Sequence, residues 1–316
     1  MKRARSVAIF VLAAIATASL GAAPSRAGGL TISPEAKQAL DILYNGDSGA
    51  AIATARKIQL AQPDQPLGFL LEGEARWWQR YCAAIEIKYD MVDAWKRSKE
   101  PEDEDYFRLT DKVIQVADAQ LAKSDTAEMH FYKGMGHALK VRVYALRSEN
   151  RNAARAAVAG RAEMLRALEL DPDLADATAV LGLYNYYVST LPGIVKVLRF
   201  FMGIPGGDKE TGVKQMEVGM TRGVVMDVDI RFILSRALRQ YDQKYERALE
   251  IAEPLVSRYP KNPNFLLLLA NLNAELARNP KATEYLQAVL ALPTGASPCA
   301  GHARALANSF LTSLSK

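Results

Sequence analysis

The sequence is poor in the side chains that build metal and redox centres, with two cysteines and three histidines among 316 residues. His130 and His137 are seven positions apart, so on one helix their Cα atoms differ in height by about 10.5 Å and cannot readily share a metal ion. There is also no GxSxG nucleophile elbow, no zinc-binding helix and no dinucleotide-binding fingerprint. We therefore expect no catalytic residues, no metal site and no cofactor, and thus a protein that is not an enzyme.

Long hydrophobic runs are also missing beyond the N-terminus, where none reaches the ~20 residues that a membrane-spanning helix needs. The N-terminus itself has a basic start, MKRAR, an apolar stretch from Val7 to Leu20, and the small-x-small end Ser25-Arg26-Ala27. This pattern predicts a secretory signal peptide over residues 1–27. No cysteine directly follows the stretch and no Arg-Arg pair precedes it, which argues against a lipid anchor and twin-arginine export. We expect residues 28–316 to be a Sec-exported periplasmic protein, soluble or peripheral.

The basic balance of the chain comes largely from this leader. The formal net charge is +5, and cleavage after Ala27 removes Lys2, Arg3, Arg5 and Arg26 but no acidic residue, which leaves +1. A mature chain of nearly neutral charge lacks the electrostatic footprint of a nucleic-acid-binding protein. We expect no nucleic-acid partner.

Internal repeats become visible when the proline after each second helix is taken as a reference. A small residue stands twelve positions before each of three prolines: Ala51 before Pro63, Gly160 before Pro172 and Ala248 before Pro260. Small residues let paired helices approach closely, and proline ends the second helix. The pattern predicts an all-α fold, a single solenoid of tetratricopeptide-like helical hairpins over residues 28–316, with no linker that divides it.

Helical periodicity predicts about a dozen helices and no strand. The helices expected at 66–96 and 126–148 are longer than the helices of an ideal repeat of about 34 residues, which predicts an irregular N-terminal half. The expected ranges are 34–44, 48–61, 66–96, 102–123, 126–148, 151–170, 173–190, 208–222, 226–241, 244–258, 263–277, 280–291 and 300–314.

The two cysteines, Cys82 and Cys299, lie near opposite ends of this expected stack. A disulfide requires Cα atoms within about 7 Å of each other. We therefore expect a buried thiol at Cys82 and a loop thiol at Cys299 rather than a bridge.

A long apolar insert, residues 191–206, separates two helices of one hairpin. If residues 194–204 are helical, two cations share a narrow stripe and large apolar side chains fill the rest. One interpretation is that the insert packs on the solenoid. The other is that it contacts a membrane surface, an acyl chain or a partner helix. The candidate contacts are Lys196, Leu198, Arg199, Phe200 and Phe201.

The residues around this insert form a recognisable pattern of glycines and prolines. Gly182-x-Tyr184-Asn185, Ser189-x-Leu191-Pro192, Leu198-x-Phe200, Gly203, Gly207-Asp208-Lys209-Glu210 and Gly212 resemble the tetratricopeptide repeat protein 39 family, which includes the fungal inclusion-body clearance protein. The resemblance covers the C-terminal third to half of the chain. It implies an all-helical adaptor without an established catalytic site, in fungi associated with the mitochondrial outer membrane and lipid-droplet-linked clearance of aggregates. This chain departs from the family in its signal peptide and its shorter N-terminal region.

An aromatic and basic cluster, RWWQRY, occupies residues 76–81. Trp77 and Tyr81 are four positions apart and share a helix face, whereas Trp78 points about 100° away. These side chains either pack between helices or contribute to a concave groove that holds a peptide or an apolar ligand. The expected groove residues are Arg76, Trp78, Asn185 and Tyr186.

Together these features predict a non-catalytic exported repeat scaffold that binds a protein or peptide partner in the cell envelope. The alternative is a lipid-binding, hydrophobic-ligand-binding or peripheral membrane-associated repeat protein that uses residues 191–204.

Overall fold

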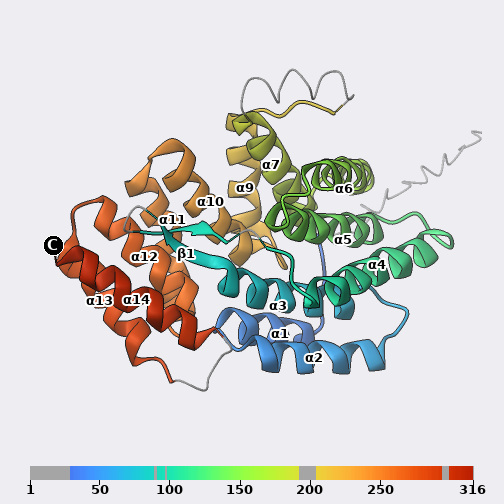
Figure 1. Ribbon diagram of the computed structural model, residues 1–316. Helices are drawn as coiled ribbons and strands as arrows, with labels where there is room; N and C mark the ends of the chain where they lie inside the picture. The colour runs from blue at the N-terminus through green and yellow to red at the C-terminus, as the bar shows by residue number, and fades with distance from the viewer. Residues whose placement is uncertain (1–28, 89–90, 97, 192–203, 294–298, 316) are drawn as a thin grey trace, which may run out of the picture.

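The computed structural model describes residues 29–88, 91–96, 98–191, 204–293 and 299–315. Consecutive helices pack as antiparallel pairs, and the pairs follow one another in a curved stack (Figure 1). The pairs are α1 (Pro34–Tyr44) with α2 (Ser48–Ala61), α3 (Leu67–Ala84) with α4 (Glu102–Leu121), α5 (Ala127–Leu146) with α6 (Asn150–Leu170), α7 (Ala175–Thr190) with α9 (Lys209–Arg222), α10 (Asp227–Asp242) with α11 (Tyr245–Arg258), and α12 (Pro263–Glu275) with α13 (Asn279–Ala291). A final helix, α14 (Ala300–Leu314), packs on α13 and α12. The predicted tetratricopeptide-like all-α solenoid is confirmed.

Local sequence signals set many of the helix ends. The hydroxyl of Ser33 accepts a hydrogen bond from the Ala36 amide at the start of α1, and the side chain of Asn262 caps α12, where Pro263 occupies the first turn. Such caps satisfy amides that have no partner within the helix. The reference prolines Pro63, Pro172 and Pro260 each stand two positions after the last residue of a second helix, which is α2, α6 or α11.

The predicted helix over 66–96 is wrong in its second half. Helix α3 ends at Ala84, and the chain continues into an antiparallel hairpin of β1 (Ile85–Lys88) and β2 (Met91–Trp95). Ile85 pairs with Trp95 at its base, and the register shifts between Glu86 and Ile87. The sequence IEIK alternates β-branched and charged residues, and this period of two is typical of a strand.

The two ends of the stack meet. Asn262, before α12, donates to the carbonyl of Tyr44 at the end of α1 (2.9 Å), and the Tyr259 hydroxyl donates to Asp41 Oδ1 (2.7 Å). In Figure 1 the orange and red C-terminal helices accordingly lie beside the blue N-terminal ones. The superhelix therefore closes on itself instead of leaving both ends apart.

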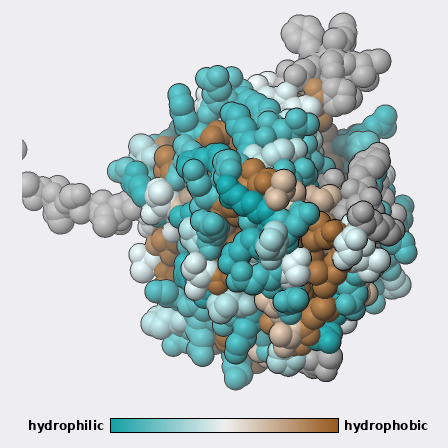
Figure 2. Space-filling model, turned by 90° about the vertical axis from the view of Figure 1, so that its left-hand side faces the viewer, coloured by the Kyte–Doolittle hydropathy of each residue, from teal (hydrophilic) through white to brown (hydrophobic). Residues whose placement is uncertain are grey.

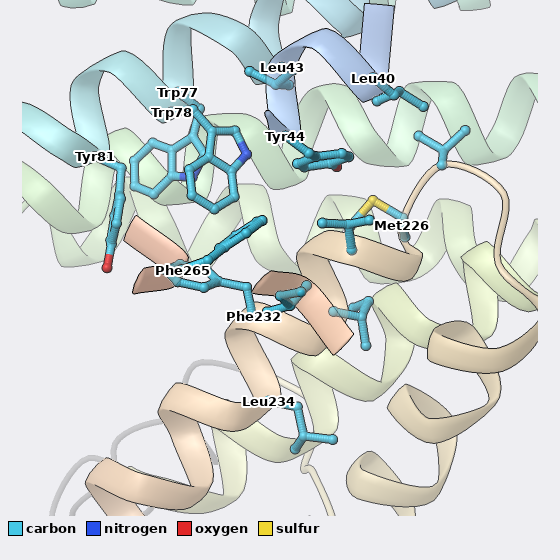
Figure 3. Packing of buried hydrophobic residues seen from close by; sticks show 14 of the residues in the cluster. Leu40, Leu43, Tyr44, Trp77, Trp78, Tyr81, Met226, Phe232, Leu234 and Phe265 are labelled. Carbon is cyan, nitrogen blue, oxygen red and sulfur yellow. The ribbon is translucent and has the colours of Figure 1, made fainter. Parts of the chain in front are cut away.

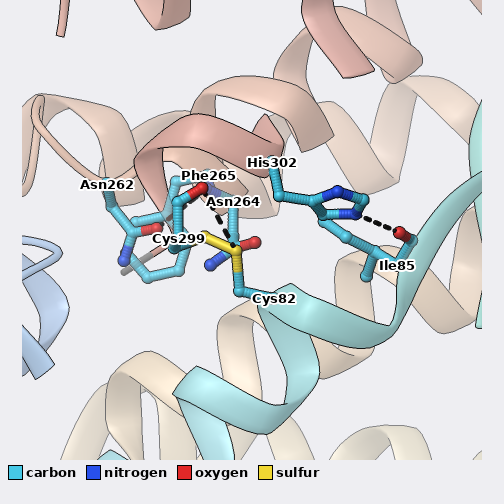
Figure 4. The surroundings of a disulfide bond; sticks show 7 residues. All are labelled: Cys82, Ile85, Asn262, Asn264, Phe265, Cys299 and His302. Carbon is cyan, nitrogen blue, oxygen red and sulfur yellow. Dashed lines mark hydrogen bonds between the residues drawn. A yellow bond between two sulfur atoms is a disulfide. The ribbon is translucent and has the colours of Figure 1, made fainter. Parts of the chain in front are cut away.

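This closure overturns the expectation for the cysteines. Cys82 at the end of α3 and Cys299 before α14 form a disulfide, with their Cα atoms 5.7 Å apart (Figure 4). Next to the bridge, the His302 ring lies with Nε2 2.7 Å from the carbonyl oxygen of Ile85, a hydrogen bond in which the nitrogen donates. Separation along the chain was a poor guide to distance in space because the stack is curved.

The hydrophobic core lies where first helices of several pairs converge. The Trp78 ring stands 5.0 Å from Phe232 of α10, 5.6 Å from Phe265 of α12 and 6.1 Å from Tyr44 of α1, centroid to centroid (Figure 3). Tilted and edge-on arrangements of this kind are favourable for aromatic rings. The cluster fills the inside of the curve on this side, where an open solenoid would have a groove.

Helices α7 and α9 approach each other more closely than side chains allow. A Cβ placed on Gly212 would lie 2.7 Å from the amide nitrogen of Tyr186 and 2.8 Å from the carbonyl oxygen of Gly182. We predict that Gly212→Ala lowers the free energy of unfolding by about 1 to 3 kcal/mol, because backbone atoms of α7 must move away. Gly301→Ala in α14 is the matched control. Nothing lies within 4 Å of its added methyl, so this change should be neutral or stabilising by about 0.5 to 1 kcal/mol. Equal urea midpoints for the two variants would contradict the prediction.

Candidate functional site

The groove residues expected on α3 separate onto different faces. Trp78 is 6% exposed, and its indole N–H donates to Asp229 Oδ1 of α10 at 3.1 Å. Arg76 lies on another face, where its Nε donates to Glu72 Oε1 at 2.9 Å. The prediction that these two side chains line one groove is therefore wrong, and Trp78 belongs to the core.

The expected groove residues on α7 serve to join helices. The Asn185 amide donates to Gln215 Oε1 of α9 at 2.7 Å. Tyr186 is fully buried, and its hydroxyl lies 2.9 Å from Asp242 Oδ2 at the end of α10. Because Trp78 and Tyr186 are both buried, they do not form an open groove together.

The insert contacts predicted at Lys196, Leu198, Arg199, Phe200 and Phe201 lie outside the described residues, and these predictions stay untested. Where the described chain resumes, the Tyr184 hydroxyl donates to the carbonyl of Pro205 at 2.9 Å. None of the described helices combines the length and apolarity that a membrane crossing requires.

A pocket of about 340 Å³ does open beside Arg76. Its wall includes Arg80, whose Nε donates to Asp103 Oδ1 at 3.0 Å and whose Nη2 donates to the carbonyl of Ser98 at 3.0 Å. Asp103 also accepts from the amide of Glu100. Because these charged groups are paired with one another, we interpret the pocket wall as a structural contact that fixes the chain between β2 and α4.

The histidines take part in similar structural bonds. The His130 ring is held between Glu163 Oε2 and Asp125 Oδ1, each 2.6 Å from one ring nitrogen. Across the described residues, no group of three or more His, Cys, Asp and Glu side chains is arranged to hold a metal ion.

A buried ionic cluster joins three first helices of the stack. Arg142 of α5 donates through Nη1 to Glu74 Oε2 of α3 at 2.6 Å, and its Nη2 lies 3.5 Å from Asp229 Oδ2 of α10. The two carboxylates are 1% and 2% exposed. The Arg142 guanidinium also stacks 5.5 Å from the Trp77 ring. Burial raises the pKa of Glu74 to about 8, with Arg142 opposing the rise and Asp229 adding to it.

This raised pKa predicts a stability that falls with pH. The folded protein holds a proton on Glu74 between its ordinary pKa of 4.5 and about 8, whereas the unfolded chain releases it. The stabilising contribution is therefore complete below about pH 4.5 and is lost as the pH rises toward about 8, with a slope of up to about 1.4 kcal/mol per pH unit. Urea unfolding across this window should show a steeper fall of stability with pH in the wild type than in Glu74→Gln, whose amide is neutral at every pH. Glu169→Gln, at an exposed pair with Arg166, should retain the wild-type slope. Equal slopes in the wild type and in Glu74→Gln would disprove the assignment.

A second set of aromatic residues reaches solvent. Trp95 of β2, Tyr187 of α7, and Arg236 and Tyr241 of α10 form what we call the inner aromatic surface. The Arg236 guanidinium lies 5.4 Å from the Trp95 ring, and the Tyr187 and Tyr241 rings meet edge to face at 6.1 Å. Trp95 and Arg236 are partly exposed, whereas Tyr187 and Tyr241 are 36% and 49% exposed.

The arginine of this surface is held by rings. Besides Trp95, it lies 5.3 Å from the Tyr81 ring and 5.8 Å from the Phe232 ring. No carboxylate within the described part of the chain lies close enough to Arg236 to form an ion pair. Cation–π contacts compensate part of the lost hydration of a guanidinium but leave its charge unneutralised.

The Tyr187 side chain is partly open to solvent. Burial raises the pKa of its hydroxyl to about 12, against an opposing effect of Arg236 and a further rise from Tyr241 and Tyr81. Yet 36% of the residue reaches solvent. The ring thus combines a solvent-exposed part with a hydroxyl that charged and aromatic groups of α10 and α3 influence electrostatically. The solvent-facing exterior looks different: the face drawn in Figure 2 is mainly hydrophilic, with hydrophobic residues in narrow patches.

The fold and this surface define a class, a closed stack of tetratricopeptide-like helix pairs with a partly exposed aromatic and cationic surface formed by β2, α7 and α10. No protein-family model matches the chain, and no curated protein matches it.

Solved structures of helical-repeat proteins do match. The C-terminal part of a TPR repeat-containing protein from Cytophaga hutchinsonii aligns over 80% of this chain and 77% of that solved part, with 15% identity and a TM-score of 0.33. A monomeric mutant of IFIT1 with m7Gppp-AAAA aligns over 79% of this chain and 47% of its own, with 13% identity and a TM-score of 0.28. The present chain thus spans about half the length of IFIT1. TM-scores this low give these likenesses no weight for the site.

Proposed function

We propose that this protein is a non-catalytic, exported helical-repeat scaffold that binds a protein or peptide segment at the inner aromatic surface. The observation that carries the proposal is the pair of exposed rings, Tyr187 and Tyr241, beside a partly exposed arginine. Tyrosine, tryptophan and arginine are the side chains that most often anchor protein interfaces, because they bury a large area and keep a polar end. In this fold most other large aromatic side chains of the described residues are packed in the core or partly covered.

The proposed binding is tested by peptide retention. The immobilised protein is offered a degenerate pool of nine-residue peptides, and the retained amount is compared between wild type and Tyr187→Ala/Tyr241→Ala. Loss of two interface anchors should lower retention about tenfold or more. Leu60→Ala/Leu170→Ala removes two exposed apolar side chains from second helices of other pairs and should leave retention unchanged. Equal retention by the wild type and the tyrosine variant, with both folded, would rule the surface out.

Export is the second part of the proposal. The basic, apolar and small-x-small order of residues 1–27 supports it, and so does a disulfide, since such bonds persist in oxidising compartments. In a Gram-negative host the full chain should appear in the osmotic-shock fraction with Gly28 as its first residue by mass spectrometry. A chain retained in the cytoplasm with Met1 intact would contradict this part alone.

The finer kinship with the tetratricopeptide repeat protein 39 family is likewise a proposal. It is supported by the glycines and prolines around residues 182–212. Within this chain, Gly182 and Gly212 also have a packing reason, the close contact of α7 with α9.

A further inference from the structure

Resting on that proposed function, we propose that the bound segment is an acidic peptide whose carboxylate pairs with Arg236. The inner aromatic surface then recognises charge through the arginine and apolar or aromatic side chains through Tyr187 and Tyr241.

The first step is the charge balance of the inner helices. Arg142 is compensated by Glu74 and Asp229, and Arg239 lies 3.6 Å from Glu275 Oε1. Arg236 has no such carboxylate among the described residues, although it is partly buried. A positive charge withdrawn from water without a counterion is unfavourable, so an incoming carboxylate gains more here than at a solvated arginine.

The second step is the carboxylate that lies closest along the same helix. Asp242 ends α10 next to Tyr241, but its oxygens are bound by the Tyr186 hydroxyl and by Lys209. It is committed to the junction of α7, α9 and α10. The surface therefore keeps a net positive charge, and a negatively charged ligand balances it.

The third step is geometry. A guanidinium is planar, and stacking on rings occupies its face while its N–H groups point outward along the edge. These edge donors fit the two oxygens of a carboxylate in a bidentate pair. The rings of Tyr81, Trp95 and Phe232 lie 5.3 to 5.8 Å from the Arg236 guanidinium and restrict its side chain, which reduces the entropy lost on binding.

The same features favour a peptide over other anionic partners. Anionic bilayers are bound through clusters of several lysines and arginines, whereas this surface offers one uncompensated cation among the described residues. Nucleic acids need several uncompensated cations along their backbone, and this surface offers a single one among the described residues.

The test uses three degenerate peptide pools that differ only in a fixed central residue: glutamate, glutamine or lysine. Wild-type protein should retain the glutamate pool about tenfold or more above the glutamine pool, as expected for a charge-assisted hydrogen bond, and the lysine pool least. Arg236→Gln should erase the difference between the pools. Arg236→Lys should restore only part of it, because an ammonium cannot form the bidentate pair. Arg247→Gln changes an exposed arginine on α11 that pairs with Glu217 and Glu250, and should leave the preference intact.

Each other outcome overturns the inference in a distinct way. Equal retention of the glutamate and glutamine pools by the wild type would contradict recognition of a carboxylate. The scaffold proposal survives that result if Tyr187→Ala/Tyr241→Ala retains neither pool. Retention of none of the pools ends both proposals. Sedimentation with phosphatidylglycerol vesicles that is abolished in Arg236→Gln assigns the arginine to a lipid headgroup instead. Because the pool comparison is made on the wild type, it decides the question even if Arg236→Gln does not fold.

Discussion

Removal of the Cys82–Cys299 bridge should lower the free energy of unfolding by about 4 kcal/mol. The bonded residues are 217 positions apart, so the bridge closes a long loop and strongly restricts the unfolded chain. The bridge also ties α14 to α3, next to the contact of His302 with Ile85. Cys82→Ser/Cys299→Ser should therefore unfold at a markedly lower urea concentration than the oxidised wild type.

A reductant provides the control for this prediction. Dithiothreitol should bring the wild type to the midpoint of the serine variant and should not affect the variant itself. If the oxidised wild type and the serine variant share one midpoint, the bridge contributes nothing to stability.

Arg142→Met should be nearly as damaging, at about 3 to 5 kcal/mol. The substitution preserves much of the volume of the side chain but leaves Asp229 buried without a compensating charge, beside a Glu74 that holds its proton at neutral pH. The loss should be measured by urea unfolding at neutral pH.

Two further variants separate charge from packing at this cluster. Adding Glu74→Gln and Asp229→Asn to Arg142→Met removes the uncompensated charge and should recover a large part of the lost stability. Arg247→Met, at an arginine that is half exposed, should change stability by less than about 0.5 kcal/mol. No recovery in the triple variant would mean that Arg142 acts through its stack on Trp77 and not through its charge.

The sequence predicts the helices well where their ends depend on neighbouring residues. The ranges 34–44 and 48–61 agree with α1 and α2 because Ser33 and Asp47 cap the starts and a proline follows α2 closely. The error at 66–96 has a different cause. The amphipathic pattern of α3 runs directly into IEIK, and no glycine or proline separates the helix from the strand.

Helical periodicity does not show which helix packs against each face of a given helix. The pattern at residues 76–81 shows that Trp77 and Trp78 point in different directions, but the assignment of Trp78 to a groove requires knowing that α10 and α12 lie opposite it. These helices are about 150 to 190 residues away in the chain and reach Trp78 only because the stack closes. The disulfide was missed for the same reason, because the sequence does not show that the stack closes.

On α7 the prediction is off by one residue, and it does not include Trp95, Arg236 or Tyr241. Tyr186 was expected at the surface and is buried against α10, whereas the adjacent Tyr187 is exposed. One position rotates a side chain by about 100° around the helix axis, enough to exchange core for solvent. The aromatic run YNYY indicated that α7 carries ring residues on several faces, but the choice among them depends on the position of α10.

The hairpin of β1 and β2 has an outer edge that a neighbouring helix protects against pairing with other molecules. A two-stranded ribbon leaves backbone groups unpaired on its outer edges, and such edges can recruit strands from other molecules. Asn271 of α12 blocks one of them: its Oδ1 accepts from the Val92 amide at 3.1 Å, and its Nδ2 donates to the Val92 carbonyl at 2.5 Å. One side-chain amide thus imitates the backbone of a third strand. At Val92 the ribbon is closed to intermolecular pairing, and exchange of Asn271 for leucine would open the route by which this otherwise helical protein could form β-rich aggregates.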